Sequence, residues 1–429
     1  MTLRHTLIGA LSIALLVCPG LLTAPAAAQP GANLPAFYDL PAGPAGPAGS
    51  LVSSEAVPLT LAVPTPAGAL PGKATRIMFH TRDTHDAAAV STGLVLTPAT
   101  PWRGPGPQPL IAYLNGVHGM GRQCAPSIQI PGGIQYTPPL DVMAEYELPF
   151  LYLLLAQGFS VVVPDYPGLG VAGGPSALDP IAESRTALDA IRAAQHLGDP
   201  AIPATGPVVV TGYSQGGNAA AGLAEQQPSY APELDLRGVV AGSVPVDMAT
   251  LFNAATIGAL SGVSGYLLHT LAAQSSQAAQ AVSESLSPAG RALMDSVTGQ
   301  CAAETVLRHG FQNPNAWSVD GRPLLDVLTE KPVLREVMER LALGNHTPTV
   351  PILLITGDND DLPADSVREL ARRWCARGTT LALHESTIPT IAPGLIIGHS
   401  LNLITAFPTV MLDWIHQRLT GQPAPTTCA

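Results

Sequence analysis

Positive charge is scarce in this chain of 429 residues. Lysine stands only at positions 73 and 331, charged residues make up 12% of the sequence, and the formal net charge is −11. Proteins that bind nucleic acid neutralise its phosphates with continuous basic surfaces. The composition therefore argues against nucleic acid as a partner.

Metal-binding motifs and long apolar runs are also missing. No C-x-x-C or H-x-x-x-H spacing occurs, so the sequence predicts neither a metal ion nor another cofactor. After residue 28, no stretch reaches the about 18 uninterrupted apolar residues that a membrane-spanning helix requires. We therefore expect no transmembrane anchor.

Residues 1–28 have the pattern of a secretory signal. Arg4 precedes an apolar run over residues 7–17, and small residues lead up to Ala28. This pattern predicts cleavage near Ala28 and a secreted mature protein. An even number of cysteines in an exported chain favours two disulfides, with three pairings possible. The four that remain after cleavage are Cys124, Cys301, Cys375 and Cys428.

Strand patterns alternate with helical patterns over residues 73–246 and 348–429. The series begins with an antiparallel pair over residues 75–80 and 90–96. Such alternation predicts an α/β fold with a mostly parallel sheet covered by helices on both faces. Residues 29–72 are rich in Pro, Gly and Ala, and we expect an arm that packs on the core or stays flexible.

The alternation stops over residues 247–347. Residues 248–283 contain no Asp, Glu, Lys or Arg, and their apolar residues recur at loosely helical spacing. This predicts a helical cap or lid over the carboxyl ends of the strands, where ligands enter an open α/β sheet. Two interpretations remain open, a cap whose apolar faces are buried and a lid that also presents apolar surface to lipid.

The most informative motif is Gly-Tyr-Ser-Gln-Gly at residues 212–216. An apolar run rich in valine precedes it and an Ala-rich run follows it. This context predicts the strand, turn and helix of a nucleophile elbow, with Ser214 exposed above an α/β-hydrolase sheet. The pentapeptide alone is weak, since an ordinary glycine-rich turn also produces it. In an elbow, Gly212 and Gly216 have no room for side chains.

A nucleophilic serine requires an imidazole base and a carboxylate that orients the base, in the chain order serine, acid, histidine in this fold. The loop over residues 357–363 follows an apolar strand pattern and supplies three candidate acids. We favour Asp360, because it stands three residues after Gly357 and shortly before Pro363 and a new helix. Asp358 and Asp361 remain alternatives.

Three histidines follow the acid loop. His384 lies inside a strand pattern and His416 inside the helical pattern of residues 409–419. His399 occupies a glycine-flanked segment, which we interpret as a loop between the last strand and the last helix. The sequence therefore predicts His399 as the base.

Backbone N–H groups are expected to bind the developing oxyanion. Gln215 supplies one at the start of the elbow helix. The glycine-rich segment over residues 115–121 follows the third strand, where the second donor of this fold stands. Val117 is our first choice for that donor, and His118 is the second.

With these residues in place, the chain resembles the secretory lipase family of fungi and actinobacteria over residues 73–428. Besides the elbow and the cap, the shared segments are Cys-Ala-Pro-Ser at 124–127, Pro-Asp-Tyr-Pro-Gly-Leu-Gly at 164–170 and Arg-Trp-Cys-Ala-Arg-Gly at 373–378. The resemblance implies secreted triacylglycerol lipase or carboxylesterase activity, with an acyl ester or lipid as substrate and transient contact of the cap with a lipid interface. It implies a triad of Ser214, Asp360 and His399. It also suggests the disulfides Cys124 with Cys301 and Cys375 with Cys428.

One segment departs from the family. Bacterial members usually have His-Gly-Thr-Thr-Gly after the third strand, whereas this chain has Asn-Gly-Val-His-Gly at 115–119. A threonine hydroxyl is therefore absent, and His118 stands near its position. The departure leaves the substrate preference open.

Two other functions remain as alternatives. A serine peptidase or amidase can use the same triad, but such enzymes often carry a charged specificity pocket, and the cap near the elbow is free of charge. A non-catalytic secreted binding protein can keep the fold without the chemistry. The presence of all three triad residue types in the required order argues against that function.

Overall fold

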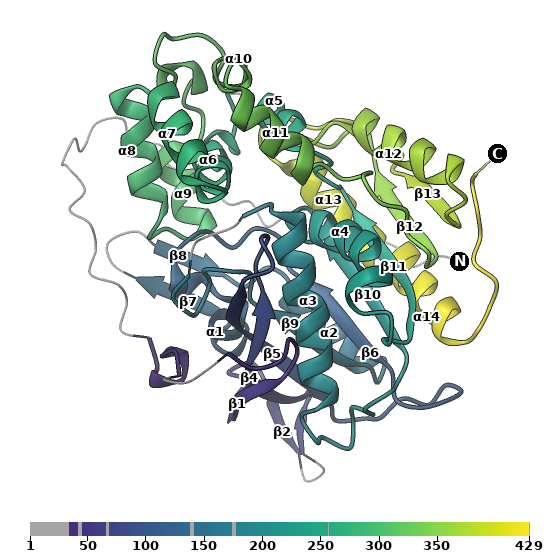
Figure 1. The fold of residues 1–429 in the computed structure, drawn as a ribbon. Coiled ribbons are helices and arrows are strands. Elements are labelled where there is room, and N and C mark those ends of the chain that lie inside the picture. Colours follow the sequence, from purple (N-terminus) through teal and green to yellow (C-terminus); the bar gives the residue numbers. More distant parts are fainter. Residues whose placement is uncertain are drawn as a thin grey trace, which may run out of the picture.

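The computed structural model describes residues 34–41, 45–65, 68–137, 141–173, 177–255 and 257–428 (Figure 1). The predicted signal segment 1–28 lies outside these residues. A nine-stranded sheet in the order β1-β4-β5-β9-β6-β10-β11-β12-β13 organises the described chain. Its strands are β1 (Leu51–Val57), β4 (Gly72–Arg82), β5 (Ala88–Pro98), β6 (Leu110–Leu114), β9 (Ser160–Pro164), β10 (Val208–Tyr213), β11 (Leu236–Gly242), β12 (Ile352–Thr356) and β13 (Leu381–Glu385).

The sheet is mostly parallel, as the sequence predicts. β1, β4, β5 and β9 pair antiparallel, and all pairs from β9 across to β13 are parallel. Every residue of β6, β9, β10 and β12 is buried, as expected for strands covered on both faces. β10 lies between β6 and β11 near the middle of the sheet.

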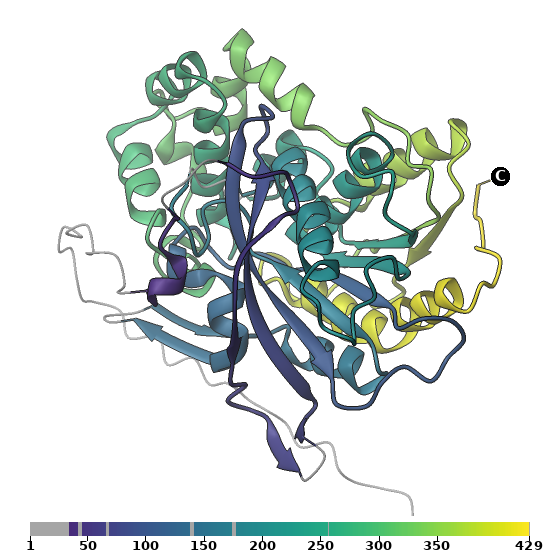
Figure 2. The same cartoon turned by 60° about the horizontal axis from the view of Figure 1, so that its bottom comes forward.

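Helices cover both faces of the sheet (Figure 1, Figure 2). Alternate residues of a strand point to opposite faces. Val208 and Val210 share one buried apolar layer with residues of α3, α4 and α12, and Val209 shares the opposite layer with residues of α2, α13 and α14. The two apolar layers hold the end of β10 in place from both sides. These helices are α2 (Leu148–Ala156), α3 (Pro180–Gln195), α4 (Gln215–Tyr230), α12 (Ala364–Ala376), α13 (Ile397–Ala406) and α14 (Leu412–Leu419).

Part of the segment expected as an arm belongs to the sheet. β1 pairs antiparallel with β4, with Ala56 opposite Thr75. A second pair, β2 (Val63–Thr65) and β3 (Gly68–Leu70), forms a separate two-stranded sheet. The repeated Pro and Gly residues end at residue 49, and the following run can therefore extend along the exposed edge of β4.

The insertion after β11 forms a layer of helices on one side of the core (Figure 1, Figure 2). Its charge-free segment has its own apolar core, in which Leu267, Leu268 and Leu271 are fully buried. Ile257 and Phe311 are exposed in the same layer, so the cap has solvent-exposed apolar side chains as well as buried ones. The helices are α5 (Met248–Ala254), α6 (Ser264–Ala273), α7 (Ser276–Ser285), α8 (Pro288–Val297), α9 (Ala302–His309), α10 (Leu324–Thr329) and α11 (Pro332–Leu341).

Two disulfides close this architecture. Cys124 bonds to Cys301 and Cys375 bonds to Cys428, which are the pairs that the resemblance implies. The first joins the core to the start of α9 in the cap and closes a loop with a sequence separation of 177 residues. By loop-closure entropy, such a crosslink contributes at most about 5 kcal/mol.

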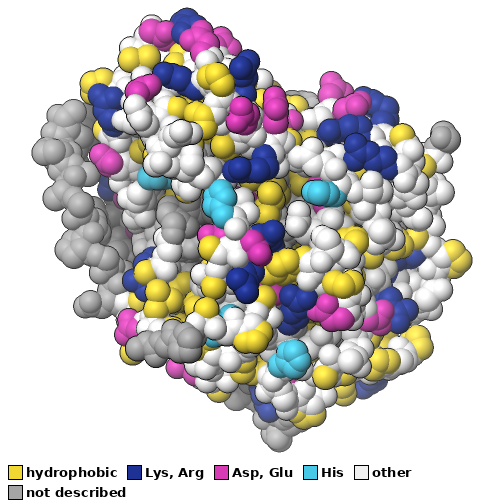
Figure 3. Space-filling model, in the orientation of Figure 1, with side chains coloured by type: hydrophobic (Ala, Val, Ile, Leu, Met, Phe, Trp, Pro, Cys, Tyr) yellow, Lys and Arg dark blue, Asp and Glu magenta, His cyan; other side chains and the backbone are white. Residues whose placement is uncertain are grey.

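Basic, acidic and hydrophobic side chains are interspersed on the surface. Figure 3 shows Lys and Arg side chains among Asp and Glu side chains on one face, with hydrophobic side chains between them. On α12, Arg368 pairs with Asp358, Asp365 and Glu385. Within the described ranges, no helix is long and apolar enough to cross a membrane.

Candidate active site

Ser214 stands in a strained turn between β10 and α4. Its φ is 59° and its ψ is −121°, a conformation that side-chain-bearing residues rarely adopt. A Cβ added to Gly212 would lie 2.1 Å from the Gly216 oxygen, and one added to Gly216 would lie 1.9 Å from the Leu114 oxygen. The steric requirement predicted for the two glycines is therefore confirmed.

Asp360 and His399 form a hydrogen-bonded pair. His399 Nδ1 lies 2.8 Å from Asp360 Oδ1, and the Asp360 side chain is 1% exposed. Burial alone would raise the pKa of Asp360, but the charge and hydrogen bond of His399 outweigh it and lower that pKa to about 2. Burial disfavours the imidazolium of His399, yet the Asp360 carboxylate raises the pKa of His399 above 6.5. A carboxylate so placed can orient an imidazole base.

The other candidate acids have different partners. Asp358 is exposed and pairs with Arg368 at 2.7 Å. Asp361 Oδ1 accepts the Gly394 N–H at 2.7 Å. Neither has a hydrogen bond to His399 among the described contacts, so Asp360 alone of the three has the geometry of a triad acid.

The remaining histidines lie apart from this pair. His384 belongs to β13. His416 belongs to α14, where its Nε2 lies 3.3 Å from Gln157 Oε1. The local structure expected for His399 is nevertheless wrong, because His399 occupies the first turn of α13 rather than a loop. Gly398 made the segment look irregular, but packing of α13 against the acid loop overrides its weak helix propensity.

Gly398 lets the backbone of α13 approach the acid loop. A Cβ at this position would lie 1.7 Å from the backbone oxygen of Asn359. We expect Gly398→Ala to displace His399 and to lower ester turnover by at least about tenfold, since misplacement by about 1 Å costs rate steeply. Gly132→Ala, whose new Cβ meets no atom within 4 Å, is the matched control. Equal turnover of both variants would contradict this account of Gly398.

Two residues that the sequence did not single out complete the environment of the pair. Ser243, directly after β11, donates from its Oγ to Asp360 Oδ2 at 2.7 Å and lies 3.0 Å from His399 Nδ1. Tyr213 donates from its hydroxyl to the His399 carbonyl at 2.9 Å, and the two rings are 5.0 Å apart. Since Tyr213 precedes Ser214 directly, it ties the elbow to the helix that carries His399.

An amide pair fixes α13 to the acid loop. Asn359 Nδ2 donates to Asn402 Oδ1 at 2.9 Å, and Asn402 Nδ2 donates back to Asn359 Oδ1 at 3.1 Å. Asn402 stands one turn after His399 on α13. Ser214 Oγ has no hydrogen bond among the described contacts, so it is not bonded to His399 in this conformation. Catalytic hydrogen bonds are often long or unformed in the absence of substrate.

The predicted oxyanion donors have free N–H groups. No acceptor within the described chain receives the N–H of Val117 or His118, and Gln215 N is the first amide of α4. The Gln215 side chain donates to Glu183 Oε1 at 2.7 Å. Burial holds the pKa of Glu183 well above its usual range.

The cap closes over the loop of residues 115–121, which carries the predicted second oxyanion donor and is called the oxyanion loop below. Met120 and Val117 pack against Tyr266, Leu293 and Trp317 of the cap. Beside Gln215, a cavity of about 10 Å³ remains, about enough for one water molecule. This cavity itself is too small for an acyl chain.

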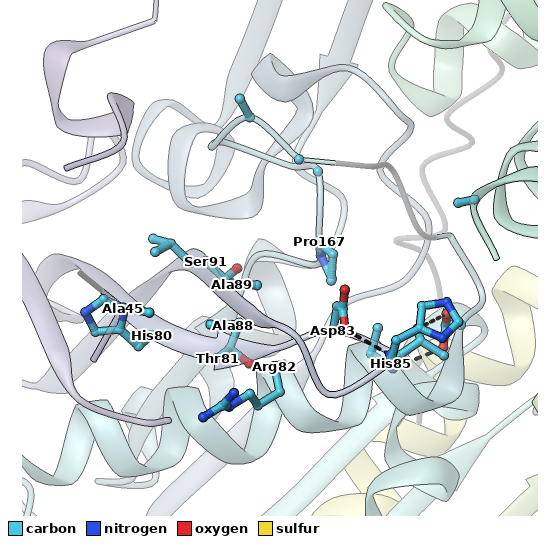
Figure 4. Close-up of a pocket in the computed structure, with 18 of the residues that line it drawn as sticks. Ala45, His80, Thr81, Arg82, Asp83, His85, Ala88, Ala89, Ser91 and Pro167 are labelled. Atoms are coloured by element: carbon cyan, nitrogen blue, oxygen red, sulfur yellow. Dashed lines mark hydrogen bonds between the residues drawn. The ribbon is translucent and has the colours of Figure 1, made fainter. Parts of the chain in front are cut away.

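A separate cavity of about 480 Å³ lies at the turn between β4 and β5. Figure 4 shows Asp83 and His85 at this turn and Pro167 opposite them. Ser214, Asp360 and His399 are not among its lining residues. This cavity is thus distinct from the candidate active site.

Comparison with known proteins identifies the family. The secretory lipase family model matches residues 136–427. A secreted triacylglycerol lipase of Malassezia restricta is 27% identical over 314 residues, which cover 71% of this chain and 62% of the relative. A probable inactive lipase of Mycobacterium tuberculosis is 26% identical over 356 residues, which cover 82% of this chain and 75% of the relative.

The fold is also that of a solved lipase. Candida antarctica lipase A in its closed state matches with a TM-score of 0.74 and 22% identity, covering 94% of this chain and 90% of that one. The predicted α/β-hydrolase fold is confirmed. Since the family model spans well over half of the sequence, the chain belongs to the secretory lipase family.

Proposed function

We propose that this protein is a secreted carboxylic ester hydrolase, a triacylglycerol lipase or carboxylesterase, with Ser214, His399 and Asp360 as its triad. The observation that carries the proposal is the hydrogen-bonded pair of Asp360 and His399 beside the strained turn at Ser214. Family membership supports the same chemistry. The chain spans only 62% of the length of the Malassezia restricta lipase.

In the proposed reaction, Ser214 Oγ attacks the acyl carbon while His399 Nε2 takes the hydroxyl proton. The N–H of Gln215 and that of Val117 or His118 bind the oxyanion, and each such donor is worth about 10²- to 10³-fold in turnover. His399 then returns the proton to the leaving alcohol, which departs as the C–O bond breaks. Water, activated by His399, hydrolyses the acyl-enzyme and frees the carboxylic acid.

The buried carboxylate of Asp360 orients the imidazole and stabilises its charged form in both halves of the reaction. Ser243 and Leu362 N–H occupy the other lone pairs of that carboxylate, which keeps its oxygen directed to His399 Nδ1. The chemistry requires no cofactor.

The cap supports an acyl substrate. Its layer of side chains over the oxyanion loop is apolar, and the stretch 248–283 is uncharged. We further propose that exposed apolar residues of the cap make transient contact with lipid interfaces. Secretion through a signal cleaved near Ala28 agrees with the secreted relatives.

The proposal is tested by hydrolysis of p-nitrophenyl esters of increasing acyl chain length, below and above their solubility. We expect turnover of esters, with a jump at the interface if the cap moves. Matched p-nitroanilides test the amidase alternative, because an amine leaves less readily than a phenol. Faster release of the anilide than of the ester would overturn the assignment as an ester hydrolase.

One relative favours a second candidate function, a non-catalytic secreted protein, because it is a probable inactive lipase. This chain has a hydrogen-bonded pair of Asp360 and His399 beside the serine, which a non-catalytic protein of the same fold does not require. Folded protein that turns over no ester of any chain length would support the second candidate.

Activity should fall in acid. The base must be neutral to take the serine proton, and Asp360 and Asp361 raise the pKa of His399 above 6.5. We therefore expect kcat/KM to fall as the pH drops through a midpoint above 6.5. Removing the charge in Asp361→Asn should move this midpoint to lower pH. An unchanged midpoint in that variant would contradict the electrostatic account of His399.

Both members of the same pair add stability, but they lose it in opposite directions of pH. The raised pKa of His399 adds stability that is complete below about 6.5 and is lost as the pH rises through the raised pKa. The lowered pKa of Asp360 adds stability above about 3.9 that is lost as the pH falls through about 2. Thermal unfolding at each pH separates these effects from loss of turnover.

A further inference from the structure

A buried cluster of three ionisable side chains lies behind the oxyanion loop. His118 Nε2 is 3.0 Å from Glu145 Oε2 and 3.9 Å from Glu147 Oε2, and all three side chains are at most 2% exposed. The glutamates belong to the segment between β8 (Asp141–Ala144) and α2. Burying these charges is costly unless each one is paired, and none of the three takes part in the proposed triad.

The cluster bonds to the backbone of the loop on both sides of Gly116. Glu147 Oε1 accepts the Gly116 N–H at 3.0 Å, and His118 Nδ1 lies 2.9 Å from the Gly116 oxygen. A carbonyl accepts only, so Nδ1 must carry a proton and donate. Nε2 then shares a second proton with Glu145, which favours the imidazolium form of His118.

Neighbouring residues occupy the other carbonyls of the loop. The Tyr146 hydroxyl donates to the Val117 oxygen at 3.2 Å, and Ala302 N–H donates to the His118 oxygen at 2.8 Å. The Tyr166 hydroxyl donates to the Asn115 oxygen at 3.0 Å. Within the described chain, the N–H groups of Val117 and His118 are left without acceptors while the backbone around them is held.

We propose that His118, paired with Glu145 and bonded to the Gly116 carbonyl, is the positioning residue that fixes the oxyanion loop for catalysis. This inference rests on the proposed function. It gives His118 a role through its side chain, in addition to the candidate role of its backbone N–H. Positions 115–119 carry no hydroxyl group, so the ion pair of His118 takes the place of a hydroxyl side chain in this loop.

The geometry makes the loop sensitive to alkaline pH. Burial disfavours the imidazolium of His118, but the charge and hydrogen bond of Glu145 outweigh it and raise the pKa of His118 to about 9. When the pH rises through that value, Nε2 loses its proton and its lone pair faces the Glu145 carboxylate. The attraction is lost, so the loop loosens and turnover falls.

Other titratable groups face the cluster from neighbouring elements. Burial raises the pKa of Glu147 to about 7, although His118 opposes the shift. Burial also keeps the pKa values of Tyr113 and Tyr166 well above 10, so these hydroxyls stay neutral. Asp165 is buried and satisfied by Ser127 and Thr92. Over the alkaline range, His118 is therefore the group whose charge changes.

Three substitutions separate the contacts. Glu145→Gln removes the charge but keeps an oxygen for Nε2–H. His118→Asn keeps a donor near the Gly116 oxygen and loses the contact to Glu145. His118→Gln keeps a donor near Glu145 and loses the contact to the Gly116 oxygen. His269→Gln is the matched control, because His269 bonds a carbonyl inside the cap, Met294 O at 2.8 Å, and does not touch the loop.

The test combines pH profiles of kcat and KM on a soluble ester with amide hydrogen exchange of residues 115–120. In Glu145→Gln, we expect the alkaline limb of kcat to move to lower pH and kcat at pH 9 to fall by about tenfold or more, with KM little changed. In both His118 variants, the fall of kcat near pH 9 should disappear. Exchange in the loop should accelerate by about tenfold or more in all three variants, since it reports local opening.

Unchanged limbs and unchanged exchange in the three variants, relative to His269→Gln, would overturn the proposal. Stoichiometric metal in the purified protein would also overturn it, because a metal ion would then replace the shared proton between His118 and the glutamates. If the wild-type protein turns over no ester, the proposed function fails, and hydrogen exchange alone decides the role of His118.

Discussion

Ser214→Ala is expected to abolish release of p-nitrophenol from acyl esters. The substitution removes the proposed nucleophilic oxygen of the strained turn between β10 and α4, and no acyl-enzyme can form without it. Removal of a triad nucleophile typically lowers kcat by about 10⁶-fold. Since alanine is smaller and Ser214 Oγ has no hydrogen bond among the described contacts, the melting temperature should hardly change. Initial rates with excess variant enzyme measure the effect.

Ser243→Ala is a useful control for Ser214→Ala. Ser243 also stands in a strained turn at the end of a strand, with a φ of 44°, but its hydroxyl donates to Asp360. Its loss should lower turnover by a modest factor rather than abolish it. If Ser214→Ala retained a substantial part of the wild-type activity, another nucleophile would have to be sought.

Asp360→Asn is expected to lower kcat by about 10⁴-fold, because an amide at this position favours the wrong imidazole tautomer. The effect combines two contacts, the hydrogen bond to His399 Nδ1 and the charge that raises the pKa of His399. The volume of the side chain is unchanged. Steady-state kinetics on the plateau above the acid limb of the pH profile measure kcat where the base is deprotonated.

Asp361→Asn is the matched control for Asp360→Asn. Asp361 is the next residue in the same loop, but it accepts the Gly394 N–H instead of contacting the imidazole. Above the acid limb, its turnover should remain within about threefold of wild type, as is usual for a substitution outside the reacting groups. A larger loss in Asp361→Asn than in Asp360→Asn would reassign the acid.

The elbow could be predicted from the sequence because its determinants are local. Gly212 and Gly216 are required by contacts within the turn and with the adjacent strand, and the flanking strand and helix are continuous in the sequence. The preference for Asp360 rested on its place between Gly357 and Pro363. Among the described hydrogen bonds of the three candidate acids, the one to His399 comes from Asp360.

Residues joined across long sequence separations could not be predicted in the same way. Ser243 meets Asp360 across 117 positions, and nothing in the run after β11 distinguishes this serine from others. A hydroxyl at the carboxyl end of a strand beside the elbow is the one signal that would have suggested it. Glu145 and Glu147 lie just before α2, where acidic residues are usually exposed to solvent, yet both are buried.

Packing overrides the local propensity of the sequence in two places. Gly398 suggested a loop at His399, whereas α13 begins at Ile397 because its backbone packs directly on Asn359. β1 pairs with β4 at the edge of the sheet, in a segment whose Pro, Gly and Ala content predicts an arm that packs on the core or stays flexible. In both places, tertiary contacts supply the stabilisation that the local sequence does not reveal.

Labelling with a fluorophosphonate probe tests the central claim most directly. The probe reacts with a serine that an imidazole base activates, and peptide mass spectrometry locates the modified residue. We predict one probe per folded chain, attached to Ser214, with a labelling rate that falls in acid and is lost in Ser214→Ala. Labelling at another serine, or none on folded wild-type protein, would contradict the assignment of Ser214 as the nucleophile.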